Sequence, residues 1–215
     1  QTVIGPIGYK EKLIIQFRKL LDRLPVKFYK NRTKTIFSPS LVPFSNIVDK
    51  INKLRPDIVH LHWICNGMFN ITDLCKIKAP IVWGLHDMWS FTGGCHYDEY
   101  CGKYKNNCGN CKVLGSSKKN DLSRFVHNKK RSVYKKLPNM TIVGLSSWLA
   151  NSAKESSLFG KHKILNIPNG IDTKIFKPFL KKESLKLWGL PKNKKLILFG
   201  GMYTSDPRKG FKELS

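Results

Sequence analysis

Short apolar runs alternate with amphipathic segments along the chain. The apolar runs cover residues 57–63, 81–85, 140–145 and 164–167. Between them, apolar positions recur at helical spacing in residues 68–77, 121–137 and 147–158, the last preceded by a capping Ser146. Strand, helix, strand at these distances is a βαβ unit, which implies parallel strands and right-handed crossovers. The pattern predicts an α/β fold: a Rossmann-like parallel sheet flanked by helices.

Two further helices are predicted before the first strand. Residues 10–24 form an amphipathic helix that Pro25 should end, and Ser45 should cap a helix that stops before Pro56. The apolar stripe of the first helix consists of Leu13, Ile14, Phe17, Leu20, Leu21 and Leu24, with basic residues between them. Such a stripe is typical of a helix that docks on a core, although a basic amphipathic helix can also lie on a membrane surface.

The last part of the chain predicts the start of a second Rossmann-like domain. Residues 195–199 form an apolar run, and Lys209-Gly210 begins a helix. We therefore expect a first domain over residues 1–176, a linker over 177–192 and the first βα unit of a second domain over 193–215. Because the chain begins with Gln and ends inside this helix, we expect it to be a piece of a longer protein.

The charge favours an anionic partner. There are 39 Lys and Arg against 14 Asp and Glu, which gives a net charge of +25, while 41% hydrophobic residues allow a packed core. A field of that size favours phosphates, acidic lipid or nucleic acid, the alternative being a solvated surface. The charge is densest over residues 112–136, which read as a solvated helix face or as a contact with anionic lipid. No apolar run approaches the roughly 20 residues that span a bilayer.

An ionisable pair follows the second apolar run. Residues 81–85 stop at His86-Asp87, which places this pair at the carboxyl end of a strand, the edge where open α/β sheets bind ligands. An imidazole titrates near neutrality, so His86 could donate a hydrogen bond to a ligand or stabilise developing charge. The alternative is that both residues cap the following turn.

Four cysteines are spaced closely within residues 95–111. Cys95, Cys101, Cys108 and Cys111 suit a structural tetrahedral zinc site, with His96 as a spare ligand. Unligated thiols, disulfides and an iron–sulfur cluster are the alternatives, and a reducing cytoplasm argues against disulfides. The two remaining cysteines, Cys65 and Cys75, lie in apolar company and are predicted to be small core residues.

Several motifs carry a family resemblance. These are HLHW at 60–63, GLHDMWSFTGGCHY at 84–97, the spaced cysteines, and IPNGIDTKIFKP at 167–178. Together they resemble family 4 of the glycosyltransferases, which have the GT-B fold, and are most similar to bacterial enzymes that build capsule, exopolysaccharide or O-antigen. The resemblance runs from about Phe37 to the end of the chain. It implies that residues 1–176 form the acceptor-side domain and residues 193–215 the start of the donor-binding domain.

The resemblance also implies an activity. We expect transfer of a sugar from a nucleotide-sugar donor to a growing, lipid-linked polysaccharide acceptor, with retention of configuration and without a catalytic metal. The protein would work in the cytoplasm, peripherally on the inner face of the plasma membrane. The family's glycine loop and acidic motif would lie before Gln1 and after Ser215, so this chain alone should be inactive.

Roles for individual residues follow from the same likeness. His86 matches the family's cleft histidine, which contacts the donor sugar near the reacting centre, and Asp87 would orient the loop. Lys209 matches the lysine that holds the donor phosphates, and a glycine turn before a helix N-terminus suits a diphosphate. Arg208 and Gly210 adjoin it. The residues expected to line the cleft are His60, His62 and Asn169.

A second reading belongs to another class of protein. A zinc-bearing, basic nucleic-acid-binding module would account for the charge and the cysteines. The chain lacks a basic recognition helix tied to those cysteines, however, and this reading leaves the βαβ pattern without a purpose. A glycosyltransferase is therefore the favoured interpretation.

Overall fold

The computed structural model describes residue 5, residues 8–200 and residues 206–214. The chain forms two compact units, Gln1–Asn169 and Gly170–Ser215. The sheet and the main hydrophobic core both belong to the first unit. Within the described residues, no helix is both long enough and apolar enough to cross a membrane.

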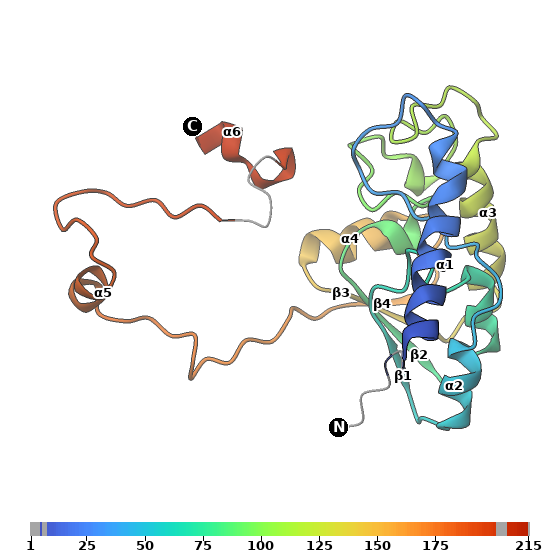
Figure 1. The fold of residues 1–215 in the computed structure, drawn as a ribbon, viewed down its shortest axis with the longest axis horizontal. Coiled ribbons are helices and arrows are strands. Elements are labelled where there is room, and N and C mark those ends of the chain that lie inside the picture. Colours follow the sequence, from blue (N-terminus) through green and yellow to red (C-terminus); the bar gives the residue numbers. More distant parts are fainter. Residues whose placement is uncertain (1–4, 6–7, 201–205, 215) are drawn as a thin grey trace. The chain divides into compact units, whose positions relative to one another are not determined.

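Four parallel strands form the sheet, in the order β1-β2-β3-β4 (Figure 1). They are β1 (Val59–Leu61), β2 (Ile81–Leu85), β3 (Thr141–Gly144) and β4 (Lys163–Asn166). Leu61 pairs with Trp83 and Leu85 pairs with Gly144, so the carboxyl ends of the strands follow one edge of the sheet. The apolar sequence of β2 suits a strand that is covered on both faces. The predicted α/β parallel sheet is confirmed.

Helices and short 3₁₀ turns precede the first strand or connect the strands. They are α2 (Ile47–Lys53), η1 (Ile71–Lys76), η2 (Trp89–Phe91), η3 (Lys103–Lys105), α3 (Leu122–Tyr134) and α4 (Ser147–Glu155). Ser146 caps α4 as predicted, because its hydroxyl accepts a hydrogen bond from the Leu149 N–H at 3.2 Å. The helix predicted over 68–77 is the shorter 3₁₀ turn η1. Asn46 directly precedes α2 but makes no side-chain capping bond, whereas the Ser45 hydroxyl accepts a hydrogen bond from the Ile47 N–H at 3.3 Å, so Ser45 caps the helix from one residue further out than predicted.

Aromatic side chains form the centre of the core beneath β2. Trp83 meets the ring of Tyr134 edge-on at 6.0 Å, and Tyr134 stacks on Phe159 at 4.9 Å. The buried Tyr134 hydroxyl donates a hydrogen bond to the Ser90 carbonyl at 2.7 Å. Edge-on and stacked rings at these distances stabilise a core beyond the area that they bury. The core therefore fixes both β2 and the loop that follows it.

The first helix, α1 (Tyr9–Lys27), continues past Pro25. The prediction that Pro25 ends the helix is wrong. Proline lacks an N–H donor and its ring crowds the carbonyl four residues earlier, but here it lies in the last turn, where little of the helix remains to be broken. The next residue, Val26, is buried in a second small core with Phe37 and Leu114, and this packing holds the last turn in place.

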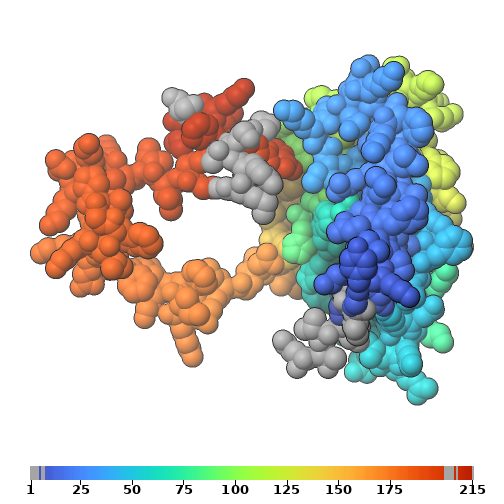
Figure 2. All heavy atoms as spheres, in the orientation of Figure 1, coloured from blue at the N-terminus to red at the C-terminus, as the bar shows by residue number. Residues whose placement is uncertain are grey.

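The apolar stripe of α1 faces away from the core. All six of its predicted residues are 36–60% exposed, whereas the buried residues of the helix are Arg18, Asp22 and Val26. Figure 2 shows α1, in blue, lying open on one face of the first unit. The Arg18 guanidinium donates hydrogen bonds to the carbonyls of Gly67 at 2.9 Å, Val42 at 3.2 Å and Pro43. A polar anchor, and not the stripe, therefore docks this helix.

The second unit contains α5 (Lys181–Leu187), η4 (Pro207–Lys209) and α6 (Phe211–Leu214). The strand predicted over residues 195–199 does not form. A strand needs a partner for its backbone hydrogen bonds, and in the described part of the chain this run has none: Ile197 is 76% exposed and Leu198 is 98% exposed. Part of the predicted βα unit, residues 201–205 and 215, lies outside the described residues. The linker and second-domain assignments stay predictions.

Candidate active site

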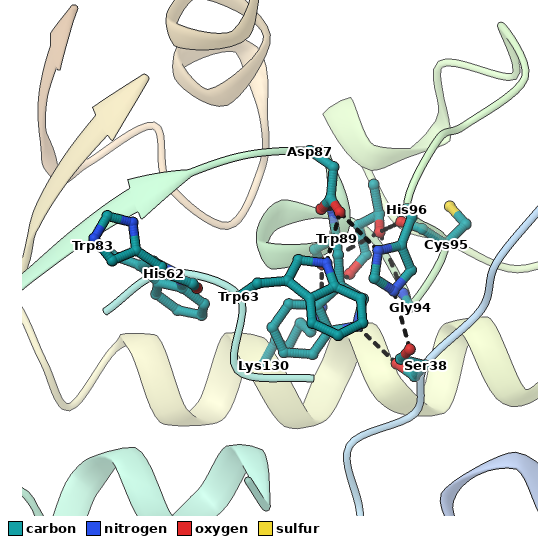
Figure 3. A network of polar contacts seen from close by, with 11 residues as sticks. Ser38, His62, Trp63, Trp83, Asp87, Trp89, Gly94, Cys95, His96 and Lys130 are labelled. Atoms are coloured by element: carbon teal, nitrogen blue, oxygen red, sulfur yellow. Dashed lines mark hydrogen bonds and ion pairs between the residues drawn. The ribbon is translucent and has the colours of Figure 1, made fainter. Parts of the chain in front are cut away.

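Two pairs of side chains meet across the carboxyl edge of the sheet. His62 and Trp63 follow β1, while His86 and Asp87 follow β2. The Nδ1 of His62 lies 2.9 Å from the Nε2 of His86. The Trp63 indole Nε1–H donates to Asp87 Oδ2 at 3.0 Å (Figure 3). Because β1 and β2 are parallel neighbours, the first residues after β1 lie beside the first residues after β2.

His60 joins this group as a third imidazole. Its ring centroid lies 4.2 Å from that of His62, whose centroid lies 5.1 Å from that of His86. All three histidines are exposed. Gly84 of β2 makes room for them, since a Cβ there would lie 3.1 Å from His62 Nδ1. Burial first, and then the neighbouring charges of His60 and His86, lower the pKa of His62. The central ring is therefore held neutral more readily than a free histidine.

Asp87 is half-buried and accepts hydrogen bonds from three protein groups. In addition to the bond from the Trp63 indole, Asp87 accepts hydrogen bonds from the Trp89 N–H at 2.9 Å and from the His96 Nδ1 at 2.7 Å. Burial alone would raise the pKa of Asp87, but the hydrogen bonds and the charge of His96 outweigh it, so that pKa is lowered. Asp87 is thus an anion that fixes the loop after β2, and it has little capacity left for a ligand.

The network continues from His96 to Ser38. The His96 Nε2 lies 2.9 Å from the Ser38 hydroxyl (Figure 3). Ser, His and Asp follow one another as in a hydrolase triad. Ser38 and His96 are only 3% and 5% exposed, however, so no substrate reaches the hydroxyl. Because both ring nitrogens of His96 are occupied, the prediction that His96 is a spare metal ligand is wrong.

Lys130 of α3 is a site residue that the sequence reading missed. It is fully buried, and its ammonium donates hydrogen bonds to the carbonyls of Trp89 and, at 3.2 Å, Thr92. The ammonium also lies 3.8 Å from the Trp89 ring centroid. Burial lowers the pKa of Lys130 to about 7. The basic run over 112–136 is therefore not a uniformly solvated face. The sequence contained one sign of this burial, because Lys130 lies four residues after Val126 and three before Val133, on the same side of the helix as these buried residues.

The cysteines are thiols in a largely apolar setting. Cys95, Cys108 and Cys111 are buried, Cys101 is half-buried, and none forms a disulfide. Burial raises the pKa of each, and Cys95 and Cys111 pack into the second small core. Among the described residues, which include all four, no three His, Cys, Asp or Glu side chains are arranged to hold a metal ion. As placed, the cysteines do not fit a zinc centre, and zinc there stays a prediction from their spacing.

The two remaining cysteines differ from each other. Cys65 is buried as predicted, and burial raises its pKa to about 12. The prediction that Cys75 is a core residue is wrong, because Cys75 is exposed. It lies on the outer side of η1, whose inward side consists of Ile71, Asp73 and Leu74.

The predicted phosphate-binding residues lie in the second unit. Arg208 pairs with Asp206 at 2.6 Å, and its hydrogen bonds lower the pKa of Asp206 to about 2. Lys209 is exposed at the end of η4, and Gly210 follows with a positive φ of 73°. Asn169 is exposed at the end of the first unit. The relation of these four residues to His86 stays a prediction.

Comparisons with known proteins identify the family of the chain. Residues 8–175 match the sequence profile of Glycosyltransferase Family 4. The chain is also 27% identical to the proposed colanic acid biosynthesis glycosyl transferase WcaC of Escherichia coli K12, over 54% of this chain and 30% of that protein. The chain thus spans less than a third of the length of this curated relative. No solved structure matches it at a significant level. The matched residues include the whole sheet and the histidines at its edge, and the chain belongs to family 4 of the glycosyltransferases.

Proposed function

We propose that the whole protein transfers a sugar from a nucleotide-sugar donor to a growing, lipid-linked polysaccharide acceptor, with retention of configuration. The observation that carries the proposal is the exposed His86 at the carboxyl edge of a parallel sheet, in a chain of this family. The likeness to a colanic acid glycosyl transferase supports a polysaccharide as the product. Work in the cytoplasm, against the anionic inner face of the membrane, belongs to the same proposal.

The geometry around His86 suits contact with a donor sugar. Its Nε2 is engaged by His62, while among the described residues no protein group bonds its Nδ1. That nitrogen is available either to accept a hydrogen bond or to donate one, depending on how the two rings share their proton. In this scheme His86 contacts the donor sugar, His60 and His62 line the cleft, and Asp87 orients the loop.

The second unit would serve the leaving group. Transfer builds negative charge on the departing diphosphate, which cationic side chains can stabilise without a metal ion. Lys209, with Arg208 and Gly210 beside it, is the proposed contact for those phosphates. Because most of the relative's length has no counterpart here, we propose that the chain alone does not catalyse transfer.

The nucleic-acid alternative gains no support. In the described residues no cluster is arranged to hold a metal ion, and the family match accounts for the βαβ pattern that the alternative left unexplained.

The test uses the full-length protein with UDP-, GDP- and dTDP-sugars. Replacing His86 by Ala should lower turnover about 100-fold or more, the range for loss of a positioned acid–base or hydrogen-bonding group. His162, a partly buried imidazole away from the sheet edge, gives a matched control as His162→Asn. Turnover within threefold of wild type for His86→Ala would remove the proposed role. Absence of any nucleotide-sugar binding by the intact protein would remove the proposed function.

A further inference from the structure

A basic cavity lies beside the His-Asp edge of the sheet. It measures about 760 Å³ and is formed by the end of α1, the segment over residues 30–37, and two residues that follow β1, Trp63 and Asn66. Its lining includes five cationic side chains: Arg23, Lys27, Lys30, Arg32 and Lys34. All five are exposed. The cavity is therefore open to solvent and its lining is strongly positive.

These cations are poorly compensated. Within the described residues Lys27, Lys30, Arg32 and Lys34 make no ion pair, and Arg23 bonds only the neutral amide of Asn66, at 3.2 Å. Carboxylates bond lining residues at two places. Glu99 accepts hydrogen bonds at 2.6 Å from the hydroxyls of two lining threonines, and Asp87 accepts one at 3.0 Å from the Trp63 indole. Two negative charges against five positive ones still leave a concave, positive site, and concave walls focus such a field.

Phosphate chemistry matches this lining best. Guanidinium and ammonium groups on flexible stems bind phosphate oxygens, Arg by paired hydrogen bonds and Lys as a point charge. A diphosphate presents several charges in a small volume, which suits cations gathered from two segments of the chain. A single carboxylate ligand would leave most of these cations unmatched.

Trp63 connects the cavity to the candidate active site. Its ring is part of the cavity wall and is 44% exposed, while its Nε1–H donates to Asp87, the neighbour of His86. An exposed indole has an apolar face and a polar edge, on which a sugar ring can lie. A ligand with its phosphates among the cations would therefore present an attached sugar near His86.

We propose that this cavity binds the diphosphate of a prenyl-diphosphate-linked acceptor. The proposal rests on the function proposed above and names the acceptor's chemical class and binding residues. α1, which supplies Arg23 and Lys27, also carries the exposed apolar stripe, so a hydrocarbon chain leaving the cavity has an apolar surface on the same helix. A free diphosphate would use the cavity alone, and an anionic bilayer would use the whole basic face.

Binding measurements on the full-length protein separate these sources. The variant Lys30→Ala, Arg32→Ala, Lys34→Ala changes exposed side chains in a segment outside the helices and strands, so we expect it to fold. The control Lys154→Ala, Lys161→Ala, Lys163→Ala removes three exposed positive charges outside the cavity. The probes, by calorimetry and vesicle sedimentation, are inorganic pyrophosphate, farnesyl diphosphate in detergent, and phosphatidylglycerol vesicles.

We expect the cavity variant to weaken farnesyl diphosphate binding at least tenfold and the control to change it less than twofold. Equal weakening by both triple variants would show a general charge effect and overturn the proposal. If the cavity variant loses only its binding to phosphatidylglycerol vesicles, the cations bind the bilayer and the proposal is overturned as well. If the protein binds a nucleotide sugar normally and the cavity variant does not weaken farnesyl diphosphate binding, the acceptor site is refuted while the proposed function stands. Specific diphosphate binding without nucleotide-sugar binding would refute the proposed function instead.

Discussion

Replacing Asp87 by Asn tests whether the loop after β2 is held by a carboxylate. The two oxygens of Asp87 accept three hydrogen bonds, from Trp63 at 3.0 Å, Trp89 at 2.9 Å and His96 at 2.7 Å. Asn keeps the size of the side chain but offers a single acceptor oxygen. In its best orientation the Asn oxygen still accepts hydrogen bonds from Trp63 and His96. Its NH₂ group then faces the Trp89 N–H, and because both are donors the third hydrogen bond is lost.

The expected cost follows from these contacts. Losing one hydrogen bond to a charged acceptor costs about 1.5–3 kcal/mol, and the two that remain lose their charge assistance. We therefore expect Asp87→Asn to lower the free energy of unfolding by about 3 kcal/mol in urea denaturation. In the full-length protein kcat should fall together with stability, because the loop also carries His86.

The control is Asp57→Asn. Asp57 is exposed just before β1, and such surface changes usually stay within about 0.5 kcal/mol. A loss below about 1 kcal/mol for Asp87→Asn, or one equal to that of the control, would refute the view that Asp87 organises the loop.

Two further predictions concern buried charge. Arg18→Met should cost about 3–5 kcal/mol in urea denaturation, because it leaves the carbonyls of Gly67, Val42 and Pro43 without their charged donor. Asp22 accepts a hydrogen bond from the N–H of the same Gly67, so the double variant with Asp22→Asn should cost less than the sum of the two single variants; additive losses would show that the residues act separately. His127 is fully buried, and its burial lowers its pKa to about 3. Because the unfolded chain takes up a proton near pH 6.5 and the folded chain does not, His127 removes stability as pH falls from that point towards 3. Between pH 7 and 5, wild type should therefore lose about 2 kcal/mol more than His127→Leu in unfolding titrations, and parallel curves would contradict the buried, neutral imidazole.

The sheet could be predicted from the sequence because its signals are local. The run over 81–85 is apolar throughout and stops at a charged pair, and β2 has these bounds. The placement of His86-Asp87 at a carboxyl edge followed from that run and from the general rule for parallel sheets. The family resemblance likewise rests on short, local motifs.

Long-range contacts account for what the sequence did not show. The stripe on α1 has ordinary helical spacing, but nothing local indicates that Arg18 will reach the carbonyls of residues 42, 43 and 67 and turn the polar side inward. Lys130 is likewise surrounded by groups distant in sequence, the carbonyls of Trp89 and Thr92. The apolar run over 195–199 satisfies every local rule for a strand, but a strand forms only against a neighbour.

The position of Trp63 also makes it an intrinsic fluorescent probe. Its indole emits from a place where one edge is bonded to the Asp87 carboxylate, the ring lies 5.3 Å from the His96 imidazole, and almost half of its surface meets water. The chain has five tryptophans, so a variant that retains this indole and has Phe at the other four positions would isolate its emission. Its spectrum would then report solvent exclusion from the cavity and rearrangement of the loop after β2 in a single optical measurement.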